Sequence, residues 1–231
     1  MGPIRRFGFV VTGVAVAGVT VLGLSGCGSS GPKTTPASTM ALNAADLPAG
    51  WTVAPPAPDK NPSTDPCGQA LKSLSDAGPQ SSTTVDATYN GSLPEVEEIL
   101  GVFGSSDKAD NALRSIYNTL SGANCQNFTT TATTSGPVTF TRQNVSPLQA
   151  GSTPDTFVAD FTFSITSGTT TLPVVIEVNR YQNVDLIITE VARQLSDLEE
   201  GGPAYSVVYE AGYKVGKLNV PPIATTGTST G

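Results

Sequence analysis

The stretch TFVADFTFSIT, residues 156–166, indicates the fold. Every second residue from Phe157 to Ile165 is apolar, whereas Asp160, Thr162 and Ser164 alternate with them. This period of two is typical of an antiparallel β-strand with one face against a core and the other face polar. The sequence on either side of the stretch is therefore expected to continue a sheet.

Two more strands follow this one. TLPVVIEVNRY (171–181) and VDLIITE (184–190) predict a hairpin that turns near Gln182 and Asn183. Its alternation extends the apolar face and leaves polar side chains on the other. We expect four of these to share one face as a ligand-binding surface, with an ordinary solvated face as the alternative. They are Asp160, Glu177, Asn179 and Asp185.

A hairpin and a helix are predicted upstream. TTVDATY (83–89) and EVEEILGVF (95–103) flank an Asn90-Gly91 turn. From Ser106 apolar residues recur at helical spacing, with Ser106 as the N-cap and Gly122 as the stop.

The C-terminal part adds helices. Pro203 suits a first helical position, and a face of Val208, Ala211, Val215 and Leu218 follows it. The stretch EVARQLSDLEE (190–200) could form another helix. Together these elements predict a single α+β domain, an antiparallel sheet flanked by helices on one face.

The N-terminus has the pattern of a secretory signal. Arg5 and Arg6 precede an uncharged run over residues 7–24, and the small residues Ser25 and Gly26 follow. A membrane-spanning helix is the alternative, because the run just reaches spanning length.

Leu24-Ser25-Gly26-Cys27 resembles a bacterial lipobox. The resemblance implies cleavage before Cys27 and a diacylglyceryl group on its thiol, which would anchor the chain on the extracytoplasmic face of the cell membrane. With Cys27 lipidated, Cys67 and Cys125 remain to form a disulfide.

The expected organisation is a signal peptide (1–26), a lipidated flexible spacer (27–42), one domain (43–220) and a disordered tail (221–231). Cleavage would leave 10 basic and 19 acidic residues. A surface this acidic disfavours nucleic acid as a partner, and it leaves the lipid as the means of holding the membrane.

The chain contains no histidine, which removes Ser-His-Asp catalysis and histidine metal sites. We therefore expect no catalytic residue, no metal, no cofactor and no enzymatic activity. Ser105 to Lys108 matches S-x-x-K but fits a helix cap better. The acid groups at 95–98 and 199–200 are interpreted as solvated, and Trp51 as a core anchor rather than a cleft residue.

Four segments together resemble the PknH-like extracellular domains of mycobacteria. They are AADLPAGW (44–51), EEILGVFGS (97–105), DKADNALRSIYNTLSGANC (107–125) and EVNRYQNVDLIIT (177–189). The resemblance implies an antiparallel sheet with flanking helices, disulfides, and a cleft proposed to sense an extracellular ligand. The family pattern has two disulfides, whereas this domain has cysteines for one.

These observations favour a membrane-anchored binding or sensor module of the cell envelope. Its partner would be a small molecule, a glycolipid or an envelope protein. The alternative is a lipid or glycolipid carrier, which would need a large apolar cavity, whereas a sensor needs only a shallow polar cleft.

Overall fold

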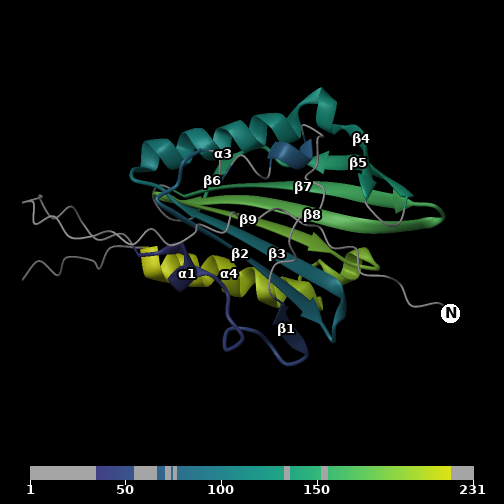
Figure 1. Ribbon diagram of the computed structural model, residues 1–231, viewed down its shortest axis with the longest axis horizontal. Coiled ribbons are helices and arrows are strands. Elements are labelled where there is room, and N and C mark those ends of the chain that lie inside the picture. Colours follow the sequence, from purple (N-terminus) through teal and green to yellow (C-terminus); the bar gives the residue numbers. More distant parts are fainter. Residues whose placement is uncertain are drawn as a thin grey trace, which may run out of the picture.

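Figure 1 shows the computed structural model of the chain, a long sheet with helices on both sides. The structure describes residues 35–54, 67–70, 74, 77–132, 136–151 and 156–219. The predicted signal peptide, Cys27 and the predicted tail lie outside these residues. Among the residues that are described, no helix is long and apolar enough to cross a bilayer.

The helices and strands occur in the following order along the chain. They are α1 (Ala37–Met40), β1 (Trp51–Ala54), β2 (Ser81–Tyr89), β3 (Ser92–Val102), α3 (Ser106–Ser121), the 3-10 turn η1 (Ala123–Cys125), β4 (Asn127–Ala132), β5 (Gly136–Val145), β6 (Gln149–Ala150), β7 (Thr156–Ser167), β8 (Thr170–Tyr181), β9 (Val184–Val191), η2 (Leu195–Asp197) and α4 (Pro203–Asn219).

All strand pairs in the sheet are antiparallel, and the strand order is β1-β2-β3-β9-β8-β7-β5-β4, with the short β6 beside β7. The predicted hairpins are confirmed. Asn90 and Gly91 take φ values of 50° and 69°, the left-handed pair that a tight hairpin turn needs and that Gly adopts without strain. The α+β prediction is confirmed as well.

The prediction that helices cover one face is wrong. α3 lies on one side of the sheet, and α1 and α4 lie on the other (Figure 1). Each side has its own core: Leu113, Ile116 and Phe161 belong to the first, and Leu186, Val207 and Val215 to the second. β9 is buried on both sides and joins the two cores, and its buried residues include Asp185, Thr189 and Glu190 beside five apolar ones.

The first folded residues come earlier than predicted. Ala37, Met40, Ala41 and Leu42 are buried against the α4 side, although the predicted spacer extends to residue 42. α1 packs against β2, and at the first residue of the helix the Ala37 N–H donates to Ser81 Oγ at 3.0 Å. In the sequence these apolar residues stand within a run rich in Ser, Thr and Pro, so no local pattern marks where the spacer ends and the folded domain begins.

The predicted helix over residues 190–200 is wrong. β9 continues to Val191, and the chain then turns through η2, where Leu195 is exposed and Leu198 enters the α4-side core. α4 begins at Pro203 as predicted and buries Val208, Ala211 and Val215, but Leu218 is exposed.

α3 agrees with its prediction apart from its cap. Ser105, not Ser106, is the N-cap, and its Oγ accepts from the Lys108 N–H at 3.4 Å. The buried face includes Leu113, Ile116 and Leu120. The capping interpretation of the S-x-x-K match is therefore confirmed, and Lys108 itself is exposed.

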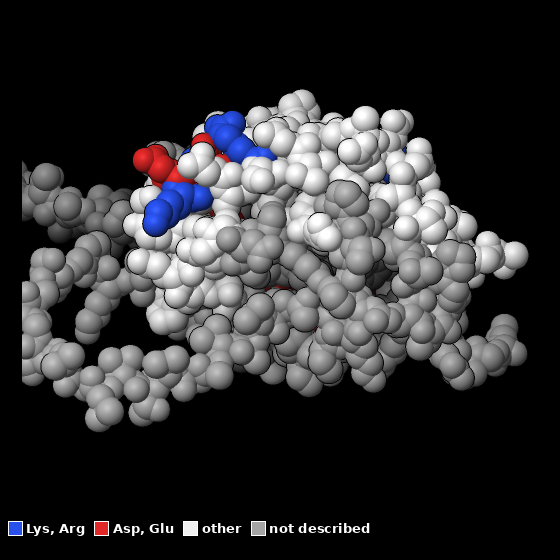
Figure 2. Space-filling view, turned by 45° about the horizontal axis from the view of Figure 1, so that its top comes forward, with Lys and Arg blue, Asp and Glu red and all other residues white. Residues whose placement is uncertain are grey.

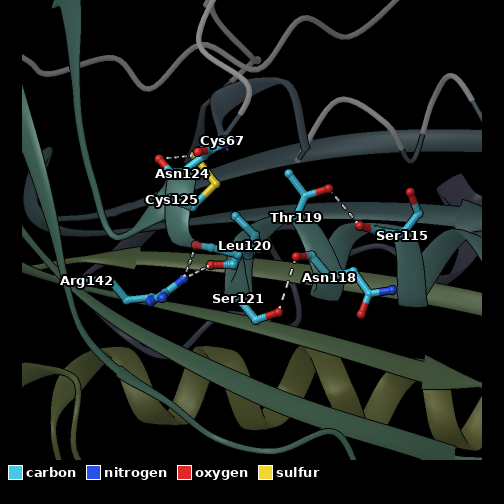
Figure 3. Close-up of a disulfide and its surroundings, with 10 residues drawn as sticks. Cys67, Ser115, Asn118, Thr119, Leu120, Ser121, Asn124, Cys125 and Arg142 are labelled. Atoms are coloured by element: carbon cyan, nitrogen blue, oxygen red, sulfur yellow. Dashed lines mark hydrogen bonds between the residues drawn. A yellow bond between two sulfur atoms is a disulfide. The ribbon is translucent and has the colours of Figure 1, made fainter.

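Cys67 and Cys125 form the predicted disulfide, which lies at the C-terminal end of α3 (Figure 3). At the same end, Arg142 from β5 donates to the carbonyl oxygen of Leu120, which the helix itself leaves without a partner, and to that of Gly122, which also accepts from the Cys125 N–H. The end of α3 is thus held both by a covalent bond and by a charged cap.

Candidate functional site

Three of the four predicted ligand-binding residues share one face of the sheet. Asp160 on β7 is directly opposite Glu177 on β8, and Asn179 is two positions further along β8. Their side chains lie on the α4 side, because their neighbours Phe161, Ile176 and Val178 fill the α3-side core. Asp160 and Glu177 are half-buried, and Asn179 is buried.

Asp185, the fourth predicted residue, points to the opposite face. It lies opposite Arg180 in the β8–β9 register, and it alternates with Leu186 and Val184, which belong to the α4-side core. The prediction assumed that a polar residue in an alternating strand faces solvent. β9 has no solvent face, so polarity there does not indicate a side, and Asp185 is fully buried under α3.

Glu190 on β9 completes the acidic group and was not predicted. It is on the α4 side, opposite Val175 and therefore diagonal to Glu177. Only 2% of it is exposed, and its Oε2 has no hydrogen-bond partner. The sequence was sufficient to predict its position, because a two-residue turn at Gln182-Asn183 sets a register that places Glu190 diagonal to Glu177.

Burial is the main reason why the pKa values of these acids are raised. It raises the pKa of Glu190 to about 8, with further raising by Glu177 and Asp160. It raises the pKa of Glu177 to about 7, where Asp160 adds to the effect and the hydrogen bond from Asn179, at 3.4 Å, opposes it. Burial also raises the pKa of Asp160. Like charges this close cannot all ionise near neutral pH.

No cation neutralises this group in the described part of the chain. The ion pairs found there join Arg114 and Arg180 to Asp110, and Lys214 to Asp46. Nor do any three Asp, Glu, Cys or His side chains among the described residues have an arrangement that could hold a metal ion. We name Asp160, Glu177, Asn179 and Glu190 the acidic sheet site.

The polar surface continues from the acidic sheet site toward β5. Thr162 and Ser164 follow Asp160 along β7, and Gln143 Nε2 donates to Ser164 Oγ at 3.1 Å. α4 packs mainly on β3 and β9, so that the β7 side chains on this face are half-buried rather than covered by a helix. The result is a shallow face of carboxyl, amide and hydroxyl groups.

The opposite face treats its charges differently. Arg180, 5% exposed, donates to the Ser106 carbonyl oxygen at 3.2 Å, and its Nη2 is 3.7 Å from Asp110 Oδ1. Its guanidinium also lies 4.5 Å from the ring centre of Phe157. Burial raises the pKa of Asp185 to about 8, although Arg180 lowers it. Charged side chains of both signs gather at one end of the surface over α3 (Figure 2). Through Ser106 and Asp110, Arg180 anchors the first turn of α3.

Other predicted acids differ in their outcome. Glu199 and Glu200 are exposed as interpreted. Glu97 and Glu98 are 4% and 0% exposed, so their interpretation as solvated acids is wrong. Glu98 accepts from the Leu42 N–H at 2.8 Å, and burial raises its pKa to about 7.

Trp51 is a core anchor as predicted. It is 7% exposed, and the centre of its ring lies 5.7 Å from that of Tyr89.

Comparison with solved structures identifies the fold. The extracellular domain of PknH from Mycobacterium tuberculosis superposes with a TM-score of 0.55 at 15% sequence identity, over 79% of this chain and 94% of that domain. An uncharacterized protein of Mycobacterium smegmatis, the Rv0999 ortholog, gives a TM-score of 0.33 at 12% identity, over 72% of this chain and 91% of its own. The first similarity shows that this chain has the fold of the PknH extracellular domain.

Comparison with protein-family models gives no match. Comparison with curated protein sequences gives none either.

Proposed function

We propose that this protein is a lipid-anchored, extracytoplasmic binding module of the cell envelope, and that it takes a polyhydroxylated ligand such as an envelope carbohydrate on the acidic sheet site. The observation that carries the proposal is the Glu190 carboxyl group, buried beside two other carboxyl groups, with an oxygen that no described group satisfies. Groups with strongly shifted pKa values and no structural partner mark functional sites more often than chance.

The chemistry of the face favours hydroxyl groups as partners. With pKa values of about 7 and 8, Glu177 and Glu190 are partly protonated near neutral pH, and each can then donate as well as accept. The Asn179 amide and the hydroxyls of Thr162 and Ser164 have the same double capacity. Adjacent sugar hydroxyls need such donors and acceptors side by side.

Packing supports a binding module over a lipid carrier. A carrier requires an apolar cavity between the sheet and a helix. Here Leu113 and Ile116 under α3, and Val207 and Val215 under α4, are fully buried, and the hollow found among the described residues lies on the outer side of α4, lined by polar as well as apolar residues. The shallow polar face matches what a sensor needs.

The extracytoplasmic location rests on the Cys27 lipobox resemblance and on the fold shared with an extracellular domain. In a host that processes lipoproteins, the parent chain should partition into the membrane fraction and the Cys27→Ala chain should not. Equal partitioning of the two would contradict lipid anchoring. We also propose that the protein has no enzymatic activity, cofactor or nucleic-acid partner, because it lacks histidine and is strongly acidic.

Ligand binding is tested on an array of soluble mono- to hexasaccharides at pH 6.5. The parent should retain a subset of glycans, and Glu190→Ala and Asp160→Ala, which remove the hydrogen-bonding groups, should weaken their retention about tenfold or more, as expected when a buried hydrogen bond loses its partner. Asp185→Ala is the matched control, since it removes a buried acid on the opposite face. Loss of binding in Asp185→Ala to the same extent, or no retained glycan at all, would overturn the proposal.

A further inference from the structure

A second surface lies on the outer side of α4, away from the acidic sheet site. Tyr205, Tyr209 and Tyr213 recur every four residues and are 41%, 62% and 51% exposed. The Tyr209 and Tyr213 rings are nearly parallel, with centres 6.3 Å apart. Single exposed aromatic residues are ordinary, but three along one helix face form a patch that folding does not explain.

The N-terminal half of this patch lines a hollow. It has a volume of about 410 Å³ between α4 and the loop before β1, and it is lined by Asp46, Pro48, Tyr205, Ser206, Tyr209 and Glu210. Two tyrosines and two acidic residues thus border one open hollow. Small-molecule sites commonly combine apolar walls with a few placed polar groups.

The loop that forms one wall is fixed in place. Asp46 Oδ2 lies 2.6 Å from Lys214 Nζ, and it accepts from the Asn43 N–H at 2.8 Å. Lys214 Nζ also donates to the Ala41 carbonyl oxygen at 2.6 Å. Because these contacts tie the loop to α4, the hollow exists before any ligand arrives, which lowers the entropic cost of binding.

The charges in the hollow do not cancel. Lys214 neutralises Asp46, whereas Glu210, on the other wall, has no ion pair among the described residues. Lys217, the next cation along α4, lies 5.7 Å from the ring centre of Tyr213, outside the hollow. One carboxylate therefore remains beside two tyrosine rings whose faces carry partial negative charge.

We propose that this hollow binds an organic cation, a quaternary or alkylated ammonium group. Such a group gains from the ring faces of Tyr205 and Tyr209 and from the carboxylate of Glu210 at once. A metal ion would gain little, because tyrosine ring faces offer it no ligand atoms. A neutral group of the same shape would keep the apolar contact but lose the electrostatic attraction.

The test uses choline and its neutral isostere 3,3-dimethyl-1-butanol, titrated into the full chain and followed by tyrosine ring resonances. Choline should bind about tenfold more tightly than the isostere, and its binding should weaken with added salt. Tyr209→Ala should lower choline affinity about fivefold or more, and Glu210→Gln about threefold or more.

Tyr213→Ala is the matched control. It removes an equally exposed tyrosine from the same helix face, but Tyr213 does not line the hollow. It should change choline affinity less than twofold. The proposal fails if the neutral isostere binds as well as choline, if Tyr213→Ala is as damaging as Tyr209→Ala, or if choline leaves the Tyr205 and Tyr209 resonances unshifted at about 50 mM, well beyond the usual range for a specific site.

Discussion

Two groups of buried acids, one on each side of the sheet, are held in different ways. On the α3 side, Asp185 and Asp110 share Arg180, which also holds the first turn of the helix. On the α4 side, Glu177 and Glu190 have, among the described residues, each other, Asp160 and one weak amide contact, and no cation. An acid with a cation nearby is explained by the fold it stabilises, whereas acids that only repel one another weaken the fold and are explained better by what they bind.

The largest expected effect concerns the cross-link that belongs to the α3 side alone. Cys67 and Cys125 are 58 residues apart, and the chain-entropy model gives about 4 kcal/mol for closing a loop of that size. The Cys67→Ser, Cys125→Ser double variant should lose that stability in urea unfolding and keep its far-ultraviolet circular dichroism. Reductant should destabilise the parent by the same amount and leave the double variant unchanged. A parent whose stability does not change with reductant would contradict the expectation.

Removing the shared cation should come next. Arg180→Met leaves Asp185 buried without its counter-charge and frees the Ser106 carbonyl oxygen, at a cost of about 3 kcal/mol at pH 8. At pH 5 the loss should be smaller, because Asp185 is then protonated. Adding Asp185→Asn should recover part of the loss at pH 8. If the double variant is no more stable than Arg180→Met alone, Arg180 does not act through the charge of Asp185.

The acids without a cation should respond in the opposite direction. Burial raises the folded-state pKa of Glu177 and Glu190 above the value of about 4.3 for an unfolded glutamate. At these two groups the folded chain therefore holds more protons than the unfolded chain. Their contribution to stability is greatest below about pH 4 and declines as the pH rises through 7 and 8.

Glu190→Gln should therefore stabilise the protein by about 1–2 kcal/mol at pH 8 and hardly at all at pH 5. The measurement is the urea midpoint of parent and variant across pH 5–9. Asp185→Asn should gain by a similar amount over the same pH range, because the pKa of Asp185 is also about 8 with the attraction of Arg180 included. The two sides are distinguished in an Arg180→Met background, where the gain from Asp185→Asn should grow and the gain from Glu190→Gln should not change. A change in both gains would mean that the two sides of the sheet do not differ.

The smallest effect tests how closely α4 approaches the sheet. A Cβ on Gly212 would lie 2.9 Å from the Tyr181 hydroxyl oxygen, at the tip of a long side chain. Gly212→Ala gains about 1 kcal/mol of helix propensity and loses a similar amount to this contact, so its net effect should be under about 1 kcal/mol. In a Tyr181→Phe background, which lacks the hydroxyl, Gly212→Ala should be more stabilising. An equal change in stability in both backgrounds would show that the contact with the Tyr181 hydroxyl is not responsible.

Local patterns in the sequence were sufficient for the elements, but less so for the arrangement of the faces. Alternation in residues 156–166 predicts β7, and helical spacing with Gly122 at its end predicts α3. These signals are local, because they depend on neighbours within one turn or one strand. Which side of the sheet a helix covers depends on contacts between distant residues, and no local pattern separates one side from two.

The candidate site follows the same rule. Asp160, Glu177 and Asn179 belong to one hairpin, where a single register sets their common face. Asp185 and Glu190 are on β9, which is buried on both faces and has apolar residues on each, so only the register across Gln182-Asn183 tells the sides apart. The hollow beside α4 was not predicted, because Asp46 and Glu210 meet only through tertiary packing.

The position of β9 also governs how the molecule can fold. Among the described residues it is the last strand, yet it lies between β3 and β8 and joins the two halves of the sheet. Until residue 191 is available, β3 and β8 each present an unpaired edge, the kind of surface that recruits other chains. Completing the sheet requires pairing residues 95–102 with 184–191, a long loop that makes folding slow. This sheet therefore closes from its middle and at the end of synthesis, rather than growing outward from a first hairpin.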